Sequence, residues 1–209
     1  MARVAATVQP RKAPTQARAQ ATVEAILAAT KKVLVSGGYE AASTNRIAEV
    51  AGVSIGSLYQ YFPSKASLVT ALVQRHMAKM FEVMTTMAQR GETSTIEEAT
   101  RTVIAAVFAA HRVNPKLHRV LIEQMVHLGA NESLDAFEAQ TQALVEQFLL
   151  SHRSELRPKN VKVAARVALL AVRGTTLWTV MRSPEHLDDE AFIDELTDMV
   201  TRYLVIDAA

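Results

Sequence analysis

A short helical segment, a glycine and a second short helical segment follow one another between residues 43 and 62. This spacing restricts the fold of the chain more than any other feature. Ser43 or Thr44 can cap the first segment, because their hydroxyls accept hydrogen bonds from free backbone N–H groups. Gly52 ends that segment, and Ser54 is placed to cap the next. Two short helices joined by a glycine turn form a helix-turn-helix.

Helical spacing of apolar residues also marks the chain before and after this motif. From Gln20 to Ser36 apolar residues recur three and four positions apart, and Gly37 and Gly38 end that helix. Further helices are predicted over Ser64 to Met87, Thr95 to Arg112, Pro115 to Leu128, Ser133 to Ser151, Asn160 to Met181 and Asp188 to Ile206. No convincing β alternation appears in the sequence. The predicted fold class is therefore all-α, with an N-terminal three-helix domain that contains the helix-turn-helix.

Composition restricts the class of protein and its compartment. The chain has 209 residues, of which 49% are hydrophobic and 21% charged, so it can build a globular core. It has no cysteine, which excludes disulfides and thiolate metal sites and favours a reducing compartment such as the cytoplasm. No apolar segment reaches the length of a membrane helix, and the first residues lack the apolar centre of a secretory signal. A cytoplasmic protein without membrane contact is expected.

Charge is distributed unevenly along the chain. The first 75 residues hold nine lysines or arginines against three glutamates, whereas the remaining residues hold fourteen against eighteen acids. A basic part next to an acidic part is typical of a domain for a polyanion joined to a domain with another task. The coincidence of the basic part with the helix-turn-helix favours this interpretation over a random scatter of surface charge.

The second short helix has the residue types that close approach to DNA requires. Gly56 and Ser57 are small enough to let the backbone come near base edges in the major groove. Tyr59 and Tyr61 end in hydroxyls that can donate to phosphate oxygens. Because tyrosine has only two side-chain torsions, it loses little entropy in such contacts.

Two cations lie where a helix does not favour them. Lys65 falls in the first turn of the helix after the motif, and Arg18 falls early in the first helix. The positive end of the helix dipole disfavours a cation there, and a bound phosphate would reverse that penalty. Taken singly, each side chain can also simply extend into water at small cost.

Residues 43–68, STNRIAEVAGVSIGSLYQYFPSKASL, resemble the DNA-binding signature of TetR-type transcriptional regulators. With the preceding helix the similarity covers about 60 residues, and the remaining helical chain has a length usual in that family. The resemblance implies a DNA-binding domain over 16–63 and a helical ligand-binding and dimerisation domain over 64–209. It also implies a DNA-binding regulator, expected to be a repressor that a small-molecule ligand releases from its operator.

The resemblance assigns individual residues to DNA. Together with the helix-dipole argument for Arg18, it places phosphate contacts at Arg18, Thr44, Tyr59, Tyr61 and Lys65, and base contacts at Asn45, Ile55, Gly56, Ser57 and Gln60. Asn45 and Gln60 can each bind adenine through two hydrogen bonds, so they are the stronger candidates for base reading. Ile55 lies three residues before Leu58, so a core position competes evenly with contact to a thymine methyl.

The first 15 residues are rich in alanine, proline and basic residues, which predicts a disordered arm. Arg3, Arg11 and Lys12 could enter the minor groove beside the main site. An unbound tail is the alternative, and the sequence favours it.

Two later segments are apolar on more than one face, so a single chain cannot bury them alone. In residues 160–181 one stripe contains Val167 and Leu177, and a second contains Ala168 and Trp178. Gly174 costs a helix about 1 kcal/mol relative to alanine and favours a close helix crossing. We therefore expect a homodimer with a four-helix interface, as the resemblance also implies. Its predicted residues are Val167, Leu170, Gly174, Leu177, Leu196, Met199 and Tyr203.

A ligand pocket is expected among the later helices, where methionine supplies adaptable walls and a few polar groups orient the ligand. The candidates are Met84, Met87, Phe108, His111, Gln124, Met125, His127, Phe137 and Trp178. For each of them taken alone, ordinary core packing is the better explanation, and only the group supports a pocket. No cofactor is expected.

Enzymatic functions find little support in the sequence. The histidines form no His-Glu-x-x-His motif, and no glycine-rich phosphate loop or GxSxG elbow is present. Glu123 and His127 have a spacing that can bind zinc, but an ion pair is the better interpretation, so no metal site is predicted. The acids at 188–190 fit a helix N-terminus and are interpreted as structural. The alternative to a DNA-binding regulator is a helical interaction module or ligand sensor that retains the helix-turn-helix without DNA binding.

Overall fold

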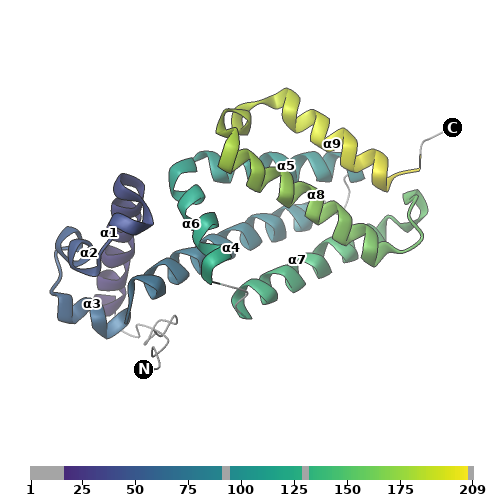
Figure 1. The fold of residues 1–209 in the computed structure, drawn as a ribbon. Helices are drawn as coiled ribbons and strands as arrows, with labels where there is room; N and C mark the ends of the chain where they lie inside the picture. Colours follow the sequence, from purple (N-terminus) through teal and green to yellow (C-terminus); the bar gives the residue numbers. More distant parts are fainter. Residues whose placement is uncertain (1–16, 91–94, 129–131, 207–209) are drawn as a thin grey trace, which may run out of the picture. The chain divides into compact units, whose positions relative to one another are not determined.

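The computed structural model describes residues 17–90, 95–128 and 132–206, with side chains outside 87–90, 125–128 and 132–134. These residues form α-helices joined by short turns (Figure 1). In chain order the elements are α1 (Ala17–Ala41), α2 (Thr44–Ala51), α3 (Ile55–Tyr61), α4 (Lys65–Arg90), α5 (Ile96–Arg112), α6 (Pro115–Leu128), α7 (Glu132–Ser151), η2 (Arg153–Glu155), α8 (Val161–Arg182), η3 (Pro184–Asp188) and α9 (Glu190–Leu204). The all-α prediction is confirmed.

The chain divides into two compact units, and the division falls inside α4. The first unit contains the residues up to His76 together with 116–131, and the second contains 77–115 and 132–209. The sequence placed the boundary at residue 63, where a proline ends the helix-turn-helix. The division lies further along because the first turns of α4 bury Leu68 and Leu72 in the core of the first unit.

The helix-turn-helix forms at the residues that the sequence indicates. Ser43 caps α2 by accepting from the Arg46 N–H at 3.2 Å, so Ser43 rather than Thr44 is the cap. Gly52 has a φ of 67° and donates its N–H to the last turn of α2. Ser54 then caps α3 by accepting from the Ser57 N–H at 3.0 Å. These local hydrogen bonds orient α3 against α2.

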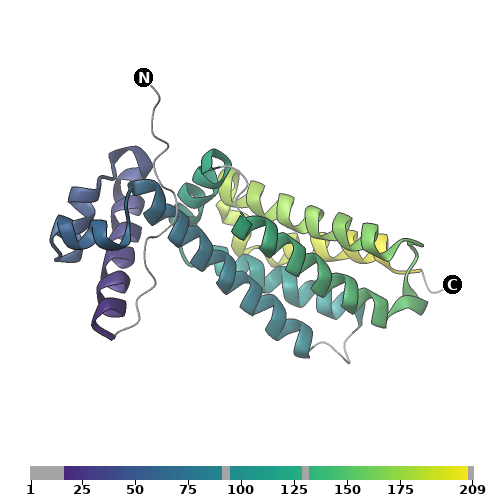
Figure 2. The same cartoon turned by 90° about the horizontal axis from the view of Figure 1, so that it is seen from below.

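Apolar side chains from α1, α2, α3 and the start of α4 are buried in the core of the first unit. The sequence spacing that made each helix amphipathic also decides which side is inward. Fully buried members are Ile26, Leu34, Ile47, Leu58 and Leu68. Figure 2 shows α1, α2 and α3 gathered around the start of α4.

The second unit is a layered bundle in which α5, α8 and α9 lie side by side and α7 packs along α8 (Figures 1 and 2). Thr95 and Glu98 form a capping box at the start of α5. Asp189 caps α9, while Asp188 pairs with Arg112 and Glu190 with Arg101. The acids at 188–190 are therefore structural, as the sequence indicated.

Candidate nucleic-acid interface

The outer surface of α3 consists of the small and polar residues that the sequence assigned to base contact. Leu58 is fully buried and fixes α3 in the first unit, whereas Gly56, Tyr59 and Gln60 are exposed. Ile55 is 38% exposed, so its side chain lies toward the outer surface and not in the core. This position at the first residue of α3 argues against the core alternative, and contact with a thymine methyl stays a prediction.

Gly56 is not required by the fold. A Cβ atom built at this position would lie 3.9 Å from Ser54 Oγ, which is an ordinary contact. Its φ does not lie in the left-handed region, so alanine would fit here without strain. Because Gly56 has no side chain, another molecule can approach the α3 backbone closely at this point of the outer surface.

Two of the predicted phosphate-binding residues converge. The Tyr59 hydroxyl lies 3.0 Å from Thr44 Oγ1, at hydrogen-bond distance, and both residues belong to the outer part of the unit. This pair joins the start of α2 to α3 and places two hydroxyls at one point. One of the two O–H groups donates within the pair, so the other remains to donate to a phosphate oxygen. Tyr61 is half-buried at the end of α3.

Lys65 has a role inside the chain that the sequence analysis missed. Its ammonium donates to the Tyr39 carbonyl at 2.8 Å and lies 4.0 Å from the centre of the Tyr39 ring. The sequence offered a phosphate or water as the partner of this cation, whereas in the structure a carbonyl and a ring already compensate it in part. An ammonium carries three N–H donors and the carbonyl accepts one, so the group can still bind a phosphate.

Tyr39 belongs to the end of α1, beyond a break in the helix. Gly38 has a φ of 71° and leaves the helical conformation, which turns the following residue toward α4. Burial raises the pKa of the Tyr39 phenol, and the nearby Glu40 carboxylate raises it further. An aromatic residue directly after a helix-ending glycine is the only signal in the sequence that could have indicated this contact.

The remaining predicted DNA contacts lie at the surface or outside the described residues. Arg18 is exposed in the first turn of α1, Asn45 is exposed on α2, and Ser57 is half-buried beside Ser54. Arg3, Arg11 and Lys12 lie outside the described residues.

α8 leaves an apolar face exposed, as the two-stripe pattern indicated. Val167, Leu170 and Gly174 are exposed along one side of the helix, while Ala164 and Ala168 are buried on the other. By length and composition alone α8 could also cross a membrane, although a third of that window is buried inside the chain. A helix with one face in its own core and one apolar face outside fits a subunit interface at least as well.

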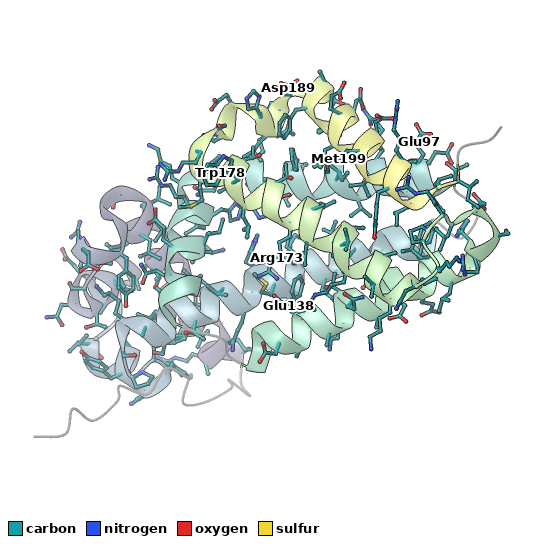
Figure 3. The ribbon with its side chains drawn as sticks, turned by 45° about the vertical axis from the view of Figure 1, so that its right-hand side comes forward. Glu97, Glu138, Arg173, Trp178, Asp189 and Met199 are labelled. Atoms are coloured by element: carbon teal, nitrogen blue, oxygen red, sulfur yellow. The ribbon has the colours of Figure 1, made fainter. Side chains whose placement is uncertain are left out.

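Two residues were assigned to the wrong surface. Trp178 was expected in a pocket, but its side chain is 66% exposed, one turn after Gly174 on the same side of α8 (Figure 3). Leu196 was expected in a dimer interface, but it is 5% exposed in the core of its own unit. Met199 is exposed on α9, and Tyr203 and Leu177 are half-buried. Periodicity showed which residues share a face, but not which face meets the chain's own core.

The other pocket candidates occupy different places. In the second unit Met84, Phe108 and His111 are buried, and Phe137 is half-buried with its ring 6.5 Å from that of Phe81. Gln124 is buried in the first unit. The side chains of Met87, Met125 and His127 lie outside the described residues.

Metal binding finds no support among the described residues, where no group of three or more potential metal ligands occurs. Glu123, which has a zinc-compatible spacing to His127, accepts instead from Arg119 at 3.1 Å.

Two family models match the chain. Residues 26–72 match the model for bacterial regulatory proteins of the tetR family, and residues 95–204 match a tetracyclin repressor-like C-terminal domain. The first covers α2, α3 and parts of α1 and α4, and the second covers the helices from α5 to α9.

Curated relatives match only part of the chain. The nucleoid occlusion factor SlmA of Haemophilus influenzae (strain ATCC 51907) is 35% identical over 111 residues, which are 53% of this chain and 46% of that protein. The HTH-type transcriptional repressor KstR of Mycolicibacterium smegmatis is 42% identical over 55 residues, which are 26% of this chain and 27% of that protein. The chain thus spans less than half the length of these relatives.

Solved structures share the fold over about nine tenths of the chain. SmeT, the repressor of the Stenotrophomonas maltophilia multidrug efflux pump SmeDEF, superposes with a TM-score of 0.66 at 23% identity, covering 91% of this chain and 93% of that one. A TetR-family regulator from Mesorhizobium loti superposes with a TM-score of 0.69 at 18% identity, covering 91% and 100%. With the family models spanning both parts of the chain, these results show that the protein belongs to the TetR family of bacterial transcriptional regulators.

Proposed function

We propose that this protein is a dimeric repressor that binds a near-palindromic DNA operator and is released from it by a small-molecule ligand. The observation that carries the proposal is the outer surface of α3. Apart from Ile55, its exposed residues are small or polar. Gly56 has no structural reason to be glycine, and Tyr59 of the same helix forms a hydroxyl pair with Thr44. A surface with these properties fits the major groove.

Phosphate contacts position this surface on the duplex. Thr44 and Tyr59 offer two hydroxyls at one point, and Lys65 offers a cation held in place by its bond to the Tyr39 carbonyl. Arg18 and Tyr61 complete the proposed set. Because phosphate contacts do not depend on the DNA sequence, they supply affinity for any duplex and fix the position of the protein along it.

Base contacts supply discrimination. Gln60 and Asn45 are exposed and have the amide geometry that binds adenine through two hydrogen bonds. Ile55 is exposed at the start of α3, where it can contact a thymine methyl. Gly56 and Ser57 allow the helix to approach.

Dimerisation would bury the exposed apolar face of α8 together with Met199 of α9. A group of large exposed apolar residues marks an interaction surface. In a symmetric dimer, this face of each copy would be covered by the same face of the other. Two reading heads then lie about 34 Å, or a multiple of that, apart along the DNA, so the operator should be two-fold symmetric.

Ligand control would act through the buried residues of the second unit. Met84 lies on α4, and Phe108 and His111 lie on α5, so a ligand among them contacts the helix that continues into the reading head. A ligand can change DNA affinity only if it binds the two head spacings with different affinity.

Selection of bound fragments from random DNA tests the proposal. The expected product is a two-fold symmetric sequence, bound with a steep negative slope of log affinity against log salt. Lys65→Gln should flatten that slope. A protein that uses its helix-turn-helix for partners other than DNA would select no sequence and show no such slope.

A further inference from the structure

We infer that the ion pair between Glu24 and Arg75 fixes the angle at which α4 leaves the reading head, and thereby sets which spacing of operator half-sites the dimer accepts. The inference rests on the proposed operator binding. It assigns a positioning role to two residues outside the set proposed to contact DNA.

The pair has a directional geometry. Arg75 Nη1 donates to Glu24 Oε2 at 2.6 Å, and Nη2 of the same guanidinium donates to Glu24 Oε1. Two parallel hydrogen bonds between planar groups restrict orientation as well as distance. The hydrogen bond from Arg75 holds the pKa of Glu24 below its ordinary value, and the same bond raises the pKa of Arg75. Both groups are therefore charged at neutral pH.

Two polar ties join α4 to α1, and together they define an angle. Lys65 at the start of α4 donates to the carbonyl of Tyr39 near the end of α1, whereas Arg75 binds Glu24, which lies earlier on α1. Leu68 and Leu72 of α4 are buried, and this close packing limits the movement of the helix. The two polar ties add a directional restraint at two separate points.

The distance between Lys65 and the pair means that a small rotation of α4 about Lys65 produces a large displacement at Arg75. Lys65 and Arg75 are ten residues apart on α4, which corresponds to about 15 Å of helix. A swing of about 13° around Lys65 would displace the Arg75 end by about 3.4 Å, the rise of one base pair. Arg75 is also the last residue but one before the division between the two units, so it ends the part of α4 that belongs to the head.

Changes in folding stability or in net charge would not by themselves alter the preference for one half-site spacing. The Arg75 side chain is 42% exposed and the Glu24 side chain 61%, and an exposed ion pair of this kind contributes little to the free energy of folding. Removing the Glu24 carboxylate also removes a negative charge near DNA, which by itself should strengthen binding to every sequence. A ratio of affinities for two operators cancels both effects.

The experiment compares operators that differ only in half-site spacing. Wild-type protein is titrated with the selected palindrome, with the same palindrome lengthened or shortened by one base pair, and with a single half-site. Glu24→Gln and Arg75→Gln should each reduce the preference for the native spacing by up to about fivefold, which corresponds to the upper end of the free energy of one exposed ion pair. Single half-site affinity should not fall in Glu24→Gln, and in Arg75→Gln it should fall only by the factor that the lost positive charge imposes on every DNA.

Two further variants separate position from charge. Exchanging the partners, Glu24→Arg with Arg75→Glu, should restore the preference, and Glu24→Arg alone should lower it most. Glu49→Gln is the matched control, because it removes a carboxylate whose partner Arg46 lies on the same helix, α2. Glu49→Gln should leave the preference unchanged.

An unchanged spacing preference in both Glu24→Gln and Arg75→Gln would overturn the inference while leaving the proposed function intact. If wild-type protein selects no palindrome, the proposed function itself fails, and the inference fails with it.

Discussion

Gly56→Ala should separate DNA binding from folding, because the structure gives no folding reason for the glycine. The added Cβ would lie 3.9 Å from its nearest neighbour, Ser54 Oγ, so it creates no clash. Alanine is favoured over glycine in a helix interior by about 1 kcal/mol, and by less at the second residue of a helix. For a chain of this size we therefore expect Tm to rise by at most about 4 °C.

DNA binding should change in the opposite direction. A methyl group at Gly56 projects from the outer surface of α3 and would displace the backbone from base edges. Loss of one base contact costs about 1–3 kcal/mol, which is about 5-fold to 150-fold in affinity for each head. Binding to unrelated DNA, which depends on phosphate contacts, should fall much less.

The assay pairs thermal unfolding with fluorescence-anisotropy titrations of the selected operator and of a scrambled fragment. A Tm that drops by several degrees in Gly56→Ala would show that the glycine is structural. Unchanged operator affinity would refute the docking of α3.

The remaining predictions concern the dimer, the phosphate contacts and pH. Gly174→Ala should stabilise α8 within one chain but raise the dimer dissociation constant in analytical ultracentrifugation, since close helix crossing would no longer fit. Trp178→Ser should also weaken the dimer. Because this side chain is exposed in the single chain, the stability of the monomer should hardly change, as measured by thermal unfolding at concentrations where the dimer has dissociated. A large loss of monomer stability would place Trp178 in the core instead. Tyr59→Phe should weaken binding to operator and scrambled DNA by similar factors, whereas a loss confined to the operator would argue for base contact. The hydrogen bond from Arg75 holds the Glu24 pKa below its ordinary value, so the pair stabilises the fold above the ordinary carboxyl pKa and the stabilisation is lost as pH falls through the lowered pKa. In urea unfolding, wild type should therefore be more stable than Glu24→Gln at neutral pH, and the difference should shrink as the solution is acidified.

Much of the reading head could be predicted because its determinants are local. Caps and turn glycines act on backbone groups within a few residues, so Ser54 and Gly52 define α3 wherever the segment occurs. The spacing of Leu58 relative to Gly56 and Gln60 likewise decides which side of α3 is outward. These features follow from the geometry of one helix.

What the amino-acid sequence determined alone is therefore the set of helices, their ends and the faces that each one carries. Tertiary structure decided which face met which partner. α8 is apolar on two sides, and only the packed chain shows that Trp178 lies outside while Leu196 of α9 lies inside. The bond from Lys65 to Tyr39 and the pair of Arg75 with Glu24 join residues 26 and 51 positions apart. No local pattern encodes such contacts, because they depend on the distance and angle between whole helices, which the packing of the core sets.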